Sequence, residues 1–416
     1  MIKLLEIIIG VIFALGFLTI IFEEILKMNK AKSALFFGTL AWIVLFLAHH
    51  SNDEINHALE ETFLEISMLW LFLIAAMTFV AYMEKTGFIE HTVYRILPNK
   101  ISERKLLLIM GVFAFFFSAV ADNLTATLVA LTILVGLRIP TDKLIKFAVL
   151  IVFSANAGGV ALITGDVTTL MIFLAGKVSM SSLLVLVIPA FVSFIILYLL
   201  MARNANGNFE FKTKHEKRSK TEIAIALIFL GTIFMVIFGH MAFHIPPVLI
   251  FLFGLSIMLL TGWIHILYKK KDLQLFDYIR AIEIDSLFFF LGVLMLVGSI
   301  KQVGMLSYVG DLYNLVPTQF ANFIVGMLSA VFDNIPLTAA LLKSDLELSL
   351  IEWLGLTYAV GVGGSLLAVG SAAGVVAMSK IKELTFVRYL KYSGYVLIAY
   401  AIGFVGSVLF ATFMLG

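Results

Sequence analysis

The sequence predicts an all-α polytopic membrane protein, an inverted-topology repeat with two re-entrant hairpins and two broken helices. Three observations support this fold class: the composition, a series of long apolar runs, and a sequence block that occurs twice. Of the 416 residues, 61% are hydrophobic and only 13% are charged, and the mean hydropathy is +1.06. A soluble domain usually carries about 25% charged residues. The composition therefore indicates that lipid is the main solvent of this chain.

Apolar runs recur from one end of the chain to the other, and a bilayer-spanning helix needs roughly 20 such residues. The runs lie at about 4–22, 31–49, 62–84, 105–137, 143–178, 182–203, 221–240, 246–267, 284–304, 318–342, 351–378 and 393–414. Four of them are interrupted: 105–137 by Asp122-Asn123, 143–178 by Asn156, Gly158-Gly159 and Gly165-Asp166, 318–342 by Asp333-Asn334, and 351–378 by glycines from Gly361 to Gly374. Each half is thus predicted to contain three spans, a hairpin, a broken helix and a final span.

The positions of Lys and Arg predict the orientation of the spans, because loops rich in these residues stay on the cytoplasmic side. Basic residues concentrate in segments 203–220 and 269–280, which two spans separate. The same rule places Lys105 and Lys143 inside, so the run 105–137 between them is predicted to enter from the cytoplasm and return. Counting along the spans, the second hairpin enters from the opposite face, and the N-terminus is external.

A block that contains an Asp-Asn pair occurs once in each half of the sequence. Residues 118–124 read SAVADNL, and residues 329–335 read SAVFDNI. Farther along, two glycines six residues apart recur in both copies, and Asp166 of the first copy corresponds to Ser371 of the second. The predicted organisation is a first inverted repeat at 1–203, a cytoplasmic linker at 204–220 and a second repeat at 221–416. Inverted repeats with broken helices are typical of secondary transporters, whose binding sites lie near the bilayer midplane.

Three aspartates, Asp122, Asp166 and Asp333, fall inside apolar runs, where a carboxylate costs about 2.5–3.5 kcal/mol. A bound cation, a proton or a helix dipole must offset this cost. Helix ends at a hairpin tip supply carbonyl oxygens and amides. Unwound backbone that exposes further oxygens is expected at four glycines: Gly158, Gly159, Gly363 and Gly364. Such an anionic, oxygen-rich site suits Na⁺ or Li⁺, and a proton competes for the same carboxylates, which indicates antiport.

Each of these residues also has a purely structural interpretation. Asp122 and Asp333 could cap kinked helices, and Asp166 could cap the second half of a broken helix. Serine and threonine often bond to their own helix backbone in membranes, so the neighbouring hydroxyl groups need not be ligands. An anion carrier is a further alternative, because helix N-termini and bound Na⁺ could hold an anion where buried arginine or lysine is scarce.

Four blocks of the sequence resemble the NhaD-type sodium/proton antiporters of the ion transporter superfamily. The blocks are Ser118–Thr127, Ser154–Thr169, Ser329–Leu342 and Gly363–Met378, and the resemblance extends over nearly the whole chain. It implies that cations and protons bind at Asp122, Asn123, Thr125, Asn156, Asp166, Thr168, Ser329, Asp333, Asn334 and Ser371. Among these, Na⁺ is expected at Asp122, Asp166 and Asp333.

The resemblance also implies how such a protein works. It predicts a transport domain formed by about 105–178 and 318–378, which moves against a scaffold domain in an elevator-like cycle. It also predicts a homodimer in the inner, cytoplasmic membrane that extrudes Na⁺ or Li⁺ in exchange for protons. No cofactor, no enzymatic reaction and no nucleic-acid partner is expected, and the absence of cysteine excludes thiolate metal sites. A Na⁺-coupled anion, dicarboxylate or arsenite carrier of the same superfamily is the alternative.

Overall fold

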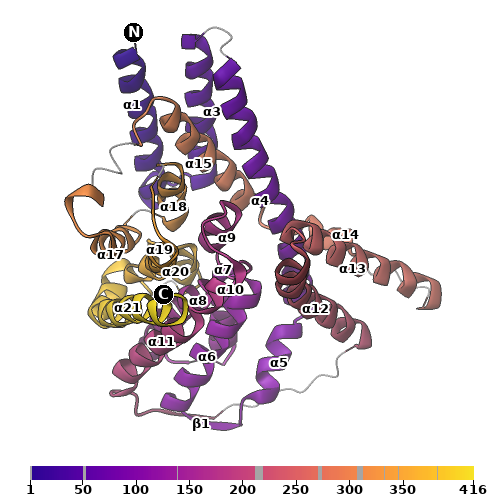
Figure 1. Ribbon diagram of the computed structural model, residues 1–416. Helices are drawn as coiled ribbons and strands as arrows, with labels where there is room; N and C mark the ends of the chain where they lie inside the picture. Colours follow the sequence, from indigo (N-terminus) through magenta and orange to yellow (C-terminus); the bar gives the residue numbers. More distant parts are fainter. Residues whose placement is uncertain are drawn as a thin grey trace.

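The computed structural model of the chain is a bundle of helices with one small sheet (Figure 1). It describes residues 2–49, 53–137, 139–210, 219–269, 274–306, 313–331, 333–344, 346–381 and 383–416. Two groups of basic residues that support the predicted orientation, within 212–218 and at 270–271, lie outside the described residues.

The first half of the chain forms eleven helices and two strands within its described residues. They are α1 (Ile2–Ile21), α2 (Glu23–Leu26), α3 (Lys30–His49), α4 (Asp53–Lys85), α5 (Phe88–Ile96), β1 (Lys100–Ser102), α6 (Glu103–Ala121), α7 (Asn123–Gly136), α8 (Thr141–Gly159), α9 (Val167–Leu174), α10 (Met180–Leu184), α11 (Val187–Ala202) and β2 (Asn208–Glu210).

The second half is helical throughout its described elements. They are α12 (Lys220–Phe243), α13 (Pro247–Lys269), α14 (Phe276–Ile279), α15 (Ile284–Gln302), α17 (Thr318–Leu328), α18 (Asn334–Lys343), α19 (Leu350–Gly363), the short 3₁₀ helix η1 (Gly364–Leu366), α20 (Ala372–Lys380) and α21 (Phe386–Leu415).

Nine helical segments among the described residues are long and apolar enough to cross a membrane. They are α1, α3, α4, α6, α10 with α11, α12, α13, α15 and α21. This length and apolarity, repeated along the chain, make it a multi-pass membrane protein. The predicted all-α polytopic fold is therefore confirmed.

The four predicted interruptions of the apolar runs are present. The run 105–137 divides into α6 and α7 at Asp122, and the run 143–178 divides into α8 and α9. In the second half, α17 and α18 are separated before Asn334, and α19 and α20 are separated by η1 and a short non-helical stretch. Because α6 is itself long enough to cross a bilayer, the re-entrant course of the two hairpins stays a prediction.

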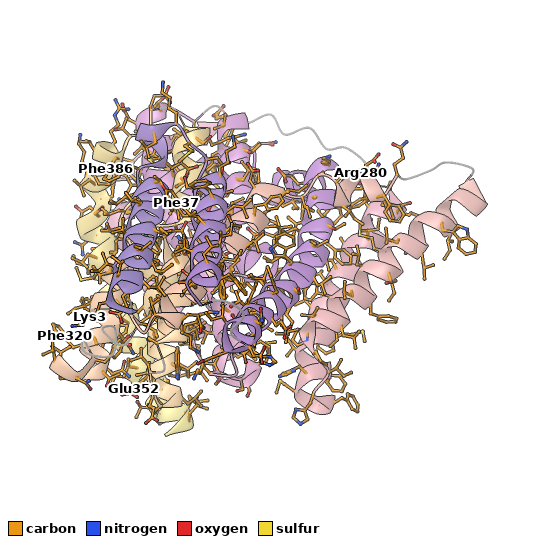
Figure 2. All side chains as sticks on the ribbon, turned by 90° about the horizontal axis from the view of Figure 1, so that it is seen from above. Lys3, Phe37, Arg280, Phe320, Glu352 and Phe386 are labelled. Atoms are coloured by element: carbon orange, nitrogen blue, oxygen red, sulfur yellow. The ribbon has the colours of Figure 1, made fainter. Side chains whose placement is uncertain are left out.

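One group of helices consists of α1, α3, α4, α12, α13 and α15. Within it, α1 and α3 pack against α15, α12 and α13 pack against α4, and α4 contacts α15. α3 runs along α15, and a Cβ atom added to Gly38 of α3 would lie 2.5 Å from the Gly292 carbonyl oxygen of α15. The approach of the two backbones therefore depends on glycine at Gly38. α12 and α13 form a pair at the edge of the molecule that packs against α4 (Figures 1 and 2).

A second group, α6 to α9 and α17 to α20, combines segments that are far apart in the sequence. α7 packs against α20, α9 against α18 and α8 against α19. Gly158 of α8 faces the backbone of Phe115 in α6, and Gly363 of α19 faces the backbone of Gly326 in α17. These two pairs occupy corresponding positions of the repeated sequence, so matched sequence produces matched packing. The opposite orientation of the two copies in a membrane stays a prediction.

The small sheet ties part of the predicted linker to the start of α6. β1 pairs with β2 in antiparallel fashion. Glu103, which is 2% exposed, accepts a hydrogen bond from the Gly207 N–H at 2.9 Å. The same carboxylate forms ion pairs with Lys143 at 2.8 Å and with Lys146 at 3.0 Å. The described residues 204–210 are thus anchored to both α6 and α8.

Candidate functional site

The break between α6 and α7 is built around Asp122, whose backbone φ is 129°. Residues other than glycine seldom adopt such an angle, and strained backbone concentrates at functional sites. The Oδ1 atom of Asp122 accepts a hydrogen bond from the backbone N–H of Thr125 at 2.7 Å, and Oδ2 accepts one from the Thr125 hydroxyl at 2.8 Å. The carboxylate thereby caps the N-terminus of α7, where the helix dipole favours negative charge.

Asp166 lies at the start of α9, and its side chain is buried, with 3% of the residue exposed. Its Oδ1 atom accepts hydrogen bonds from the Thr168 backbone N–H at 2.8 Å and from the Thr168 hydroxyl at 2.9 Å. Its Oδ2 atom accepts from the side-chain amides of Asn123 at 3.1 Å and Asn334 at 3.5 Å. The asparagines of the two Asp-Asn pairs therefore meet at one carboxylate.

Asn156, which is fully buried, links this carboxylate to the second broken helix. Its Oδ1 atom accepts a hydrogen bond from the Asn123 amide at 3.0 Å, and its Nδ2 atom donates to the Ser371 hydroxyl at 3.1 Å. The Ser371 hydroxyl also accepts from the backbone N–H of Gly374 and so caps α20. One polar network thus joins α7, α8, α9, α18 and α20, as the matched sequence blocks predict.

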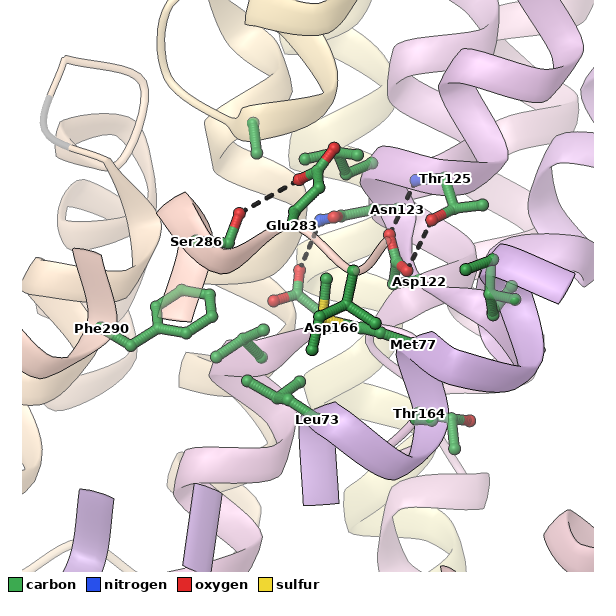
Figure 3. A pocket seen from close by; sticks show the side chains of 18 of the residues that line it. Leu73, Met77, Asp122, Asn123, Thr125, Thr164, Asp166, Glu283, Ser286 and Phe290 are labelled. Atoms are coloured by element: carbon green, nitrogen blue, oxygen red, sulfur yellow. Dashed lines mark hydrogen bonds between the residues drawn. The ribbon is translucent and has the colours of Figure 1, made fainter. Parts of the chain in front are cut away.

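A cavity of about 150 Å³ lies between this network and the helices α4 and α15. A single water needs roughly 10–15 Å³ of such space, so the cavity has room for a hydrated ion. Figure 3 shows Asp122, Asn123 and Asp166 along one wall. The opposite wall is mostly apolar, but it includes Glu283 and Ser286 at the start of α15. Because Glu283 is exposed, the cavity reaches the surface at this end of α15.

Asp333 lies apart from this network. Its Oδ2 atom forms an ion pair with the Nζ atom of Lys30, the first residue of α3, at 2.7 Å. The Lys30 ammonium also lies 4.4 Å from the centroid of the Phe289 ring. Among the described residues, no group of three or more acidic, histidine or cysteine side chains is placed to hold a metal ion. Binding of Na⁺ at Asp333 stays a prediction, since a lysine occupies that carboxylate here.

Three of the other predicted residues have local roles in the structure. The Ser329 hydroxyl donates to the Val360 carbonyl oxygen at 2.8 Å and joins α17 to α19, as the Ser118 hydroxyl joins α6 to α8 through Ala155 at 2.6 Å. Thr125 and Thr168 each hold a carboxylate in place.

The glycines Gly158, Gly159 and Gly363 lie inside the last turns of α8 and α19, and Gly364 begins η1. The non-helical backbone follows these glycines and does not include them.

Sequence reasoning missed Lys30 and Glu283 as residues near the site. In the sequence, Lys30 is a charge beside an apolar run, and its distance from Asp333 along the chain gives no signal of a contact. Glu283 precedes an apolar run, where an acidic residue is an ordinary helix start. Only the packing of α3 against α15 and of α15 against α18 brings Lys30 to Asp333, and only the packing of α15 against α4 brings Glu283 to the cavity.

Repeated apolar helices and a buried polar network between two matched halves are features of a secondary membrane transporter. The comparison with known proteins agrees. The family model described as a citrate transporter matches residues 1–374. The sequence is 33% identical to the Na(+)/H(+) antiporter NhaD of Vibrio cholerae, over 95% of this chain and 89% of that protein. It is also 33% identical to the NhaD of Vibrio parahaemolyticus, over 90% of this chain and 98% of that protein.

A third relative is the NhaD of Alkalimonas amylolytica, which is 31% identical over 94% of this chain and 87% of that protein. The chain therefore belongs to the citrate transporter family and to the family of the NhaD antiporters. The resemblance predicted from the four sequence blocks is confirmed. The prediction of a transporter and not an enzyme is confirmed by the same relatives.

Proposed function

We propose that the protein is a secondary Na⁺/H⁺ antiporter in which Na⁺ and protons compete for Asp122 and Asp166. The observation that carries this proposal is the surroundings of the buried Asp166 carboxylate, whose bonded partners are neutral hydroxyl, amide and backbone groups. Among the described residues, no basic side chain forms an ion pair with Asp122 or Asp166. A buried carboxylate without a counter-ion must be neutralised, and a proton or a small cation can each do this.

The amides of Asn123 and Asn334 can serve both occupants of Asp166. With N–H groups turned towards Oδ2, as in this structure, they stabilise the carboxylate. Rotating either amide about its last bond presents its carbonyl oxygen to a cation bound at the same place. Asn156, which is itself bonded to Ser371, accepts a hydrogen bond from the Asn123 amide. Na⁺ would then be bound by oxygen atoms alone, which hard cations prefer.

We propose further that transport follows an elevator-like cycle between two groups of helices. The transport unit consists of α6 to α9 and α17 to α20, and the scaffold consists of α1, α3, α4, α12, α13 and α15. Support comes from two cavities that separate these groups, the one beside Asp122 and a second of about 190 Å³ lined by α4 and α15 on one side and by α9 and α18 on the other. α15 with α18 is the main contact between the groups.

The proposal also includes finer features that the sequence resemblance implies. Li⁺ would replace Na⁺ at the same oxygen atoms, and the chain would lie in the cytoplasmic membrane with its N-terminus external. The outlying pair of α12 and α13 exposes large apolar side chains, including Phe234, Phe253 and Trp263. This pair is the proposed contact with a second copy in a homodimer. A citrate carrier is not favoured. Among the described residues, Lys30 is the one basic residue that lines the cavity beside Asp122, and its ammonium is already paired with Asp333.

Everted membrane vesicles from cells without their own Na⁺/H⁺ exchangers test the proposed function. After respiration has acidified the vesicles, addition of Na⁺ is expected to release protons and restore the fluorescence of a pH-sensitive dye. Li⁺ is expected to act in the same way and K⁺ is the control ion. Absence of a response to both Na⁺ and Li⁺, together with uptake of labelled citrate, would support the alternative carrier and overturn antiport.

The Thr125 hydroxyl is expected to contribute to Na⁺ affinity through Asp122. A hydrogen bond to a charged group contributes about 1.5–3 kcal/mol, so replacing Thr125 by valine is expected to raise the Na⁺ concentration for half-maximal response about tenfold. The matched control is Thr132→Val on the same helix, because the Thr132 hydroxyl bonds only to the Leu128 carbonyl oxygen of its own turn. Equal behaviour of the two variants in the vesicle assay would show that the Asp122–Thr125 contact is merely a helix cap.

A further inference from the structure

α18 is the element of the transport unit that contacts the scaffold most extensively, through α15. It is also joined to the scaffold by an ion pair at each end. At its N-terminal end, Asp333 caps the helix and pairs with Lys30 of α3. In its last turn, Lys343 pairs with Glu65 of α4 at 2.9 Å. We call these two ion pairs the α18 clasp.

The first ion pair of the clasp is held in a fixed place by the scaffold. Lys30 lies one turn before Ala34, and Phe289 lies one turn before Gly292. Around Ala34 and Gly292 the backbones of α3 and α15 approach closely. This contact sets the Lys30 ammonium over the Phe289 ring, which attracts a cation. Only 9% of the Asp333 side chain and 22% of the Lys30 side chain are exposed. The pair therefore bridges the scaffold and the transport unit in a largely desolvated position.

The second ion pair borders the other cavity. Lys343, Glu65 and Lys301 all line the cavity of about 190 Å³ between α4, α15, α9 and α18. The Lys343 side chain is 11% exposed, whereas Glu65 is 49% exposed. The clasp thus connects the transport unit to the scaffold beside both cavities, and any sliding of α18 along α15 separates both pairs.

The two ends of α18 carry charges that suit its own dipole, with Asp333 at the N-terminus and Lys343 in the last turn. The scaffold supplies the opposite charge in each case. The corresponding helix of the first repeat, α7, is different. Its capping residue Asp122 bonds to Thr125 and faces a cavity, and no ion pair of Asp122 is present among the described residues. Among the described residues, the charged connection to the scaffold is therefore present at α18 and absent at α7.

We propose that Lys30, Glu65 and Lys343 are positioning residues of the transport cycle. Through the α18 clasp they hold the transport unit in the state in which the cavity beside Asp122 is open, and both pairs break each time the unit moves. The inference rests on the elevator-like movement proposed above. It assigns these three residues a role in setting the balance between the two states, and none in binding the ion.

The absence of cysteine from the chain makes a direct test simple. Ala81 of α4 lines the open cavity and is partly buried, so a single Ala81→Cys substitution reports access to that cavity by a membrane-impermeant maleimide. Lys30→Gln in this background is expected to slow labelling about tenfold, because the state with the open cavity loses an ion pair. Lys30→Arg, which keeps the charge, is expected to label at nearly the original rate.

The second ion pair allows a rescue experiment. It compares a single variant with a double variant, so a folding defect of one variant alone does not decide the result. Glu65→Lys is expected to slow labelling at Ala81→Cys, and adding Lys343→Glu is expected to restore it by re-forming the pair with reversed charges. Glu60→Gln, five residues earlier on α4 and 75% exposed, is the matched control and should leave the rate unchanged. Labelling requires no ion gradient, so it separates this inference from the proposed function. Unchanged labelling in Lys30→Gln and in Glu65→Lys, with Na⁺/H⁺ exchange intact in the parent protein, would overturn the clasp.

Discussion

Replacing Asp166 by asparagine is expected to abolish Na⁺-dependent proton movement, with an initial rate at least about 100-fold below that of the parent protein, or about 2.7 kcal/mol. Asparagine has nearly the same shape but carries no charge that a proton and Na⁺ could exchange. Its amide would also face the N–H groups of Asn123 and Asn334 unless the side chains turned. The vesicle assay measures the loss, and the amount of protein in the membrane is compared by immunoblot.

This substitution separates the ion-binding role of Asp166 from the alternative of helix capping. Asparagine caps helix N-termini about as well as aspartate, so α9 should keep its first turn and the protein its thermal stability. Asp142→Asn is the matched control, because Asp142 is an exposed carboxylate in the first turn of α8 and should be dispensable. A variant Asp166→Asn that still responds to Na⁺ would show that the carboxylate is only a cap.

The places where helices break could be predicted because each break carries a local signal. Asp122 and Asp333 follow helices and cap the next ones, and Asp166 and Ser371 do the same after each glycine-containing segment. Such capping residues are costly inside an apolar run, so their position alone indicates a helix end. The meeting of Asn123, Asn156 and Asn334 around Asp166 also followed from the repeat, because corresponding segments were expected at one site.

The ion pairs of the site could not be predicted from the sequence. Lys30 and Asp333 are 303 residues apart, and their contact depends on how closely α3 approaches α15 and on how α18 packs against α15. A lysine at the end of an apolar run ordinarily extends its ammonium towards the interface. Here the same flexible chain reaches a carboxylate of another helix. Asp333 is therefore chemically unlike Asp122 in this structure, although the two occupy corresponding positions.

The sequence predicts that the glycines of the repeated blocks unwind the backbone. In the structure, they lie where two segments of backbone approach each other closely. Gly159 and Gly364 illustrate this, because a Cβ atom on either would lie 2.6 Å from a carbonyl oxygen of the returning chain, at Gly165 and Gly370 respectively. The returning segment begins α9 in one copy and α20 in the other. Small residues therefore set the position of Asp166 and Ser371 by letting the chain fold back tightly.

The strongest test of this packing is a single added methyl group at Gly158 or at Gly363. Within a helix, glycine to alanine normally stabilises by roughly 1 kcal/mol. At Gly158, however, the new Cβ would overlap the backbone of Phe115, and at Gly363 it would overlap the backbone of Gly326. Backbone atoms cannot turn aside as a side chain can, so α6 must move away from α8, and α17 from α19.

Overpacking of this kind costs typically about 1–3 kcal/mol, so Gly158→Ala and Gly363→Ala are each expected to lower the unfolding temperature in detergent and to impair Na⁺/H⁺ exchange. Gly231→Ala on α12 is the matched control, because a Cβ there meets no atom within 4 Å, and its unfolding temperature should stay the same or rise. A lower unfolding temperature for Gly158→Ala and Gly363→Ala, with an unchanged or higher one for Gly231→Ala, distinguishes a close backbone contact from an effect of helix propensity. Equal unfolding temperatures for Gly158→Ala, Gly363→Ala and the parent protein would show that α8 and α19 do not rely on these contacts.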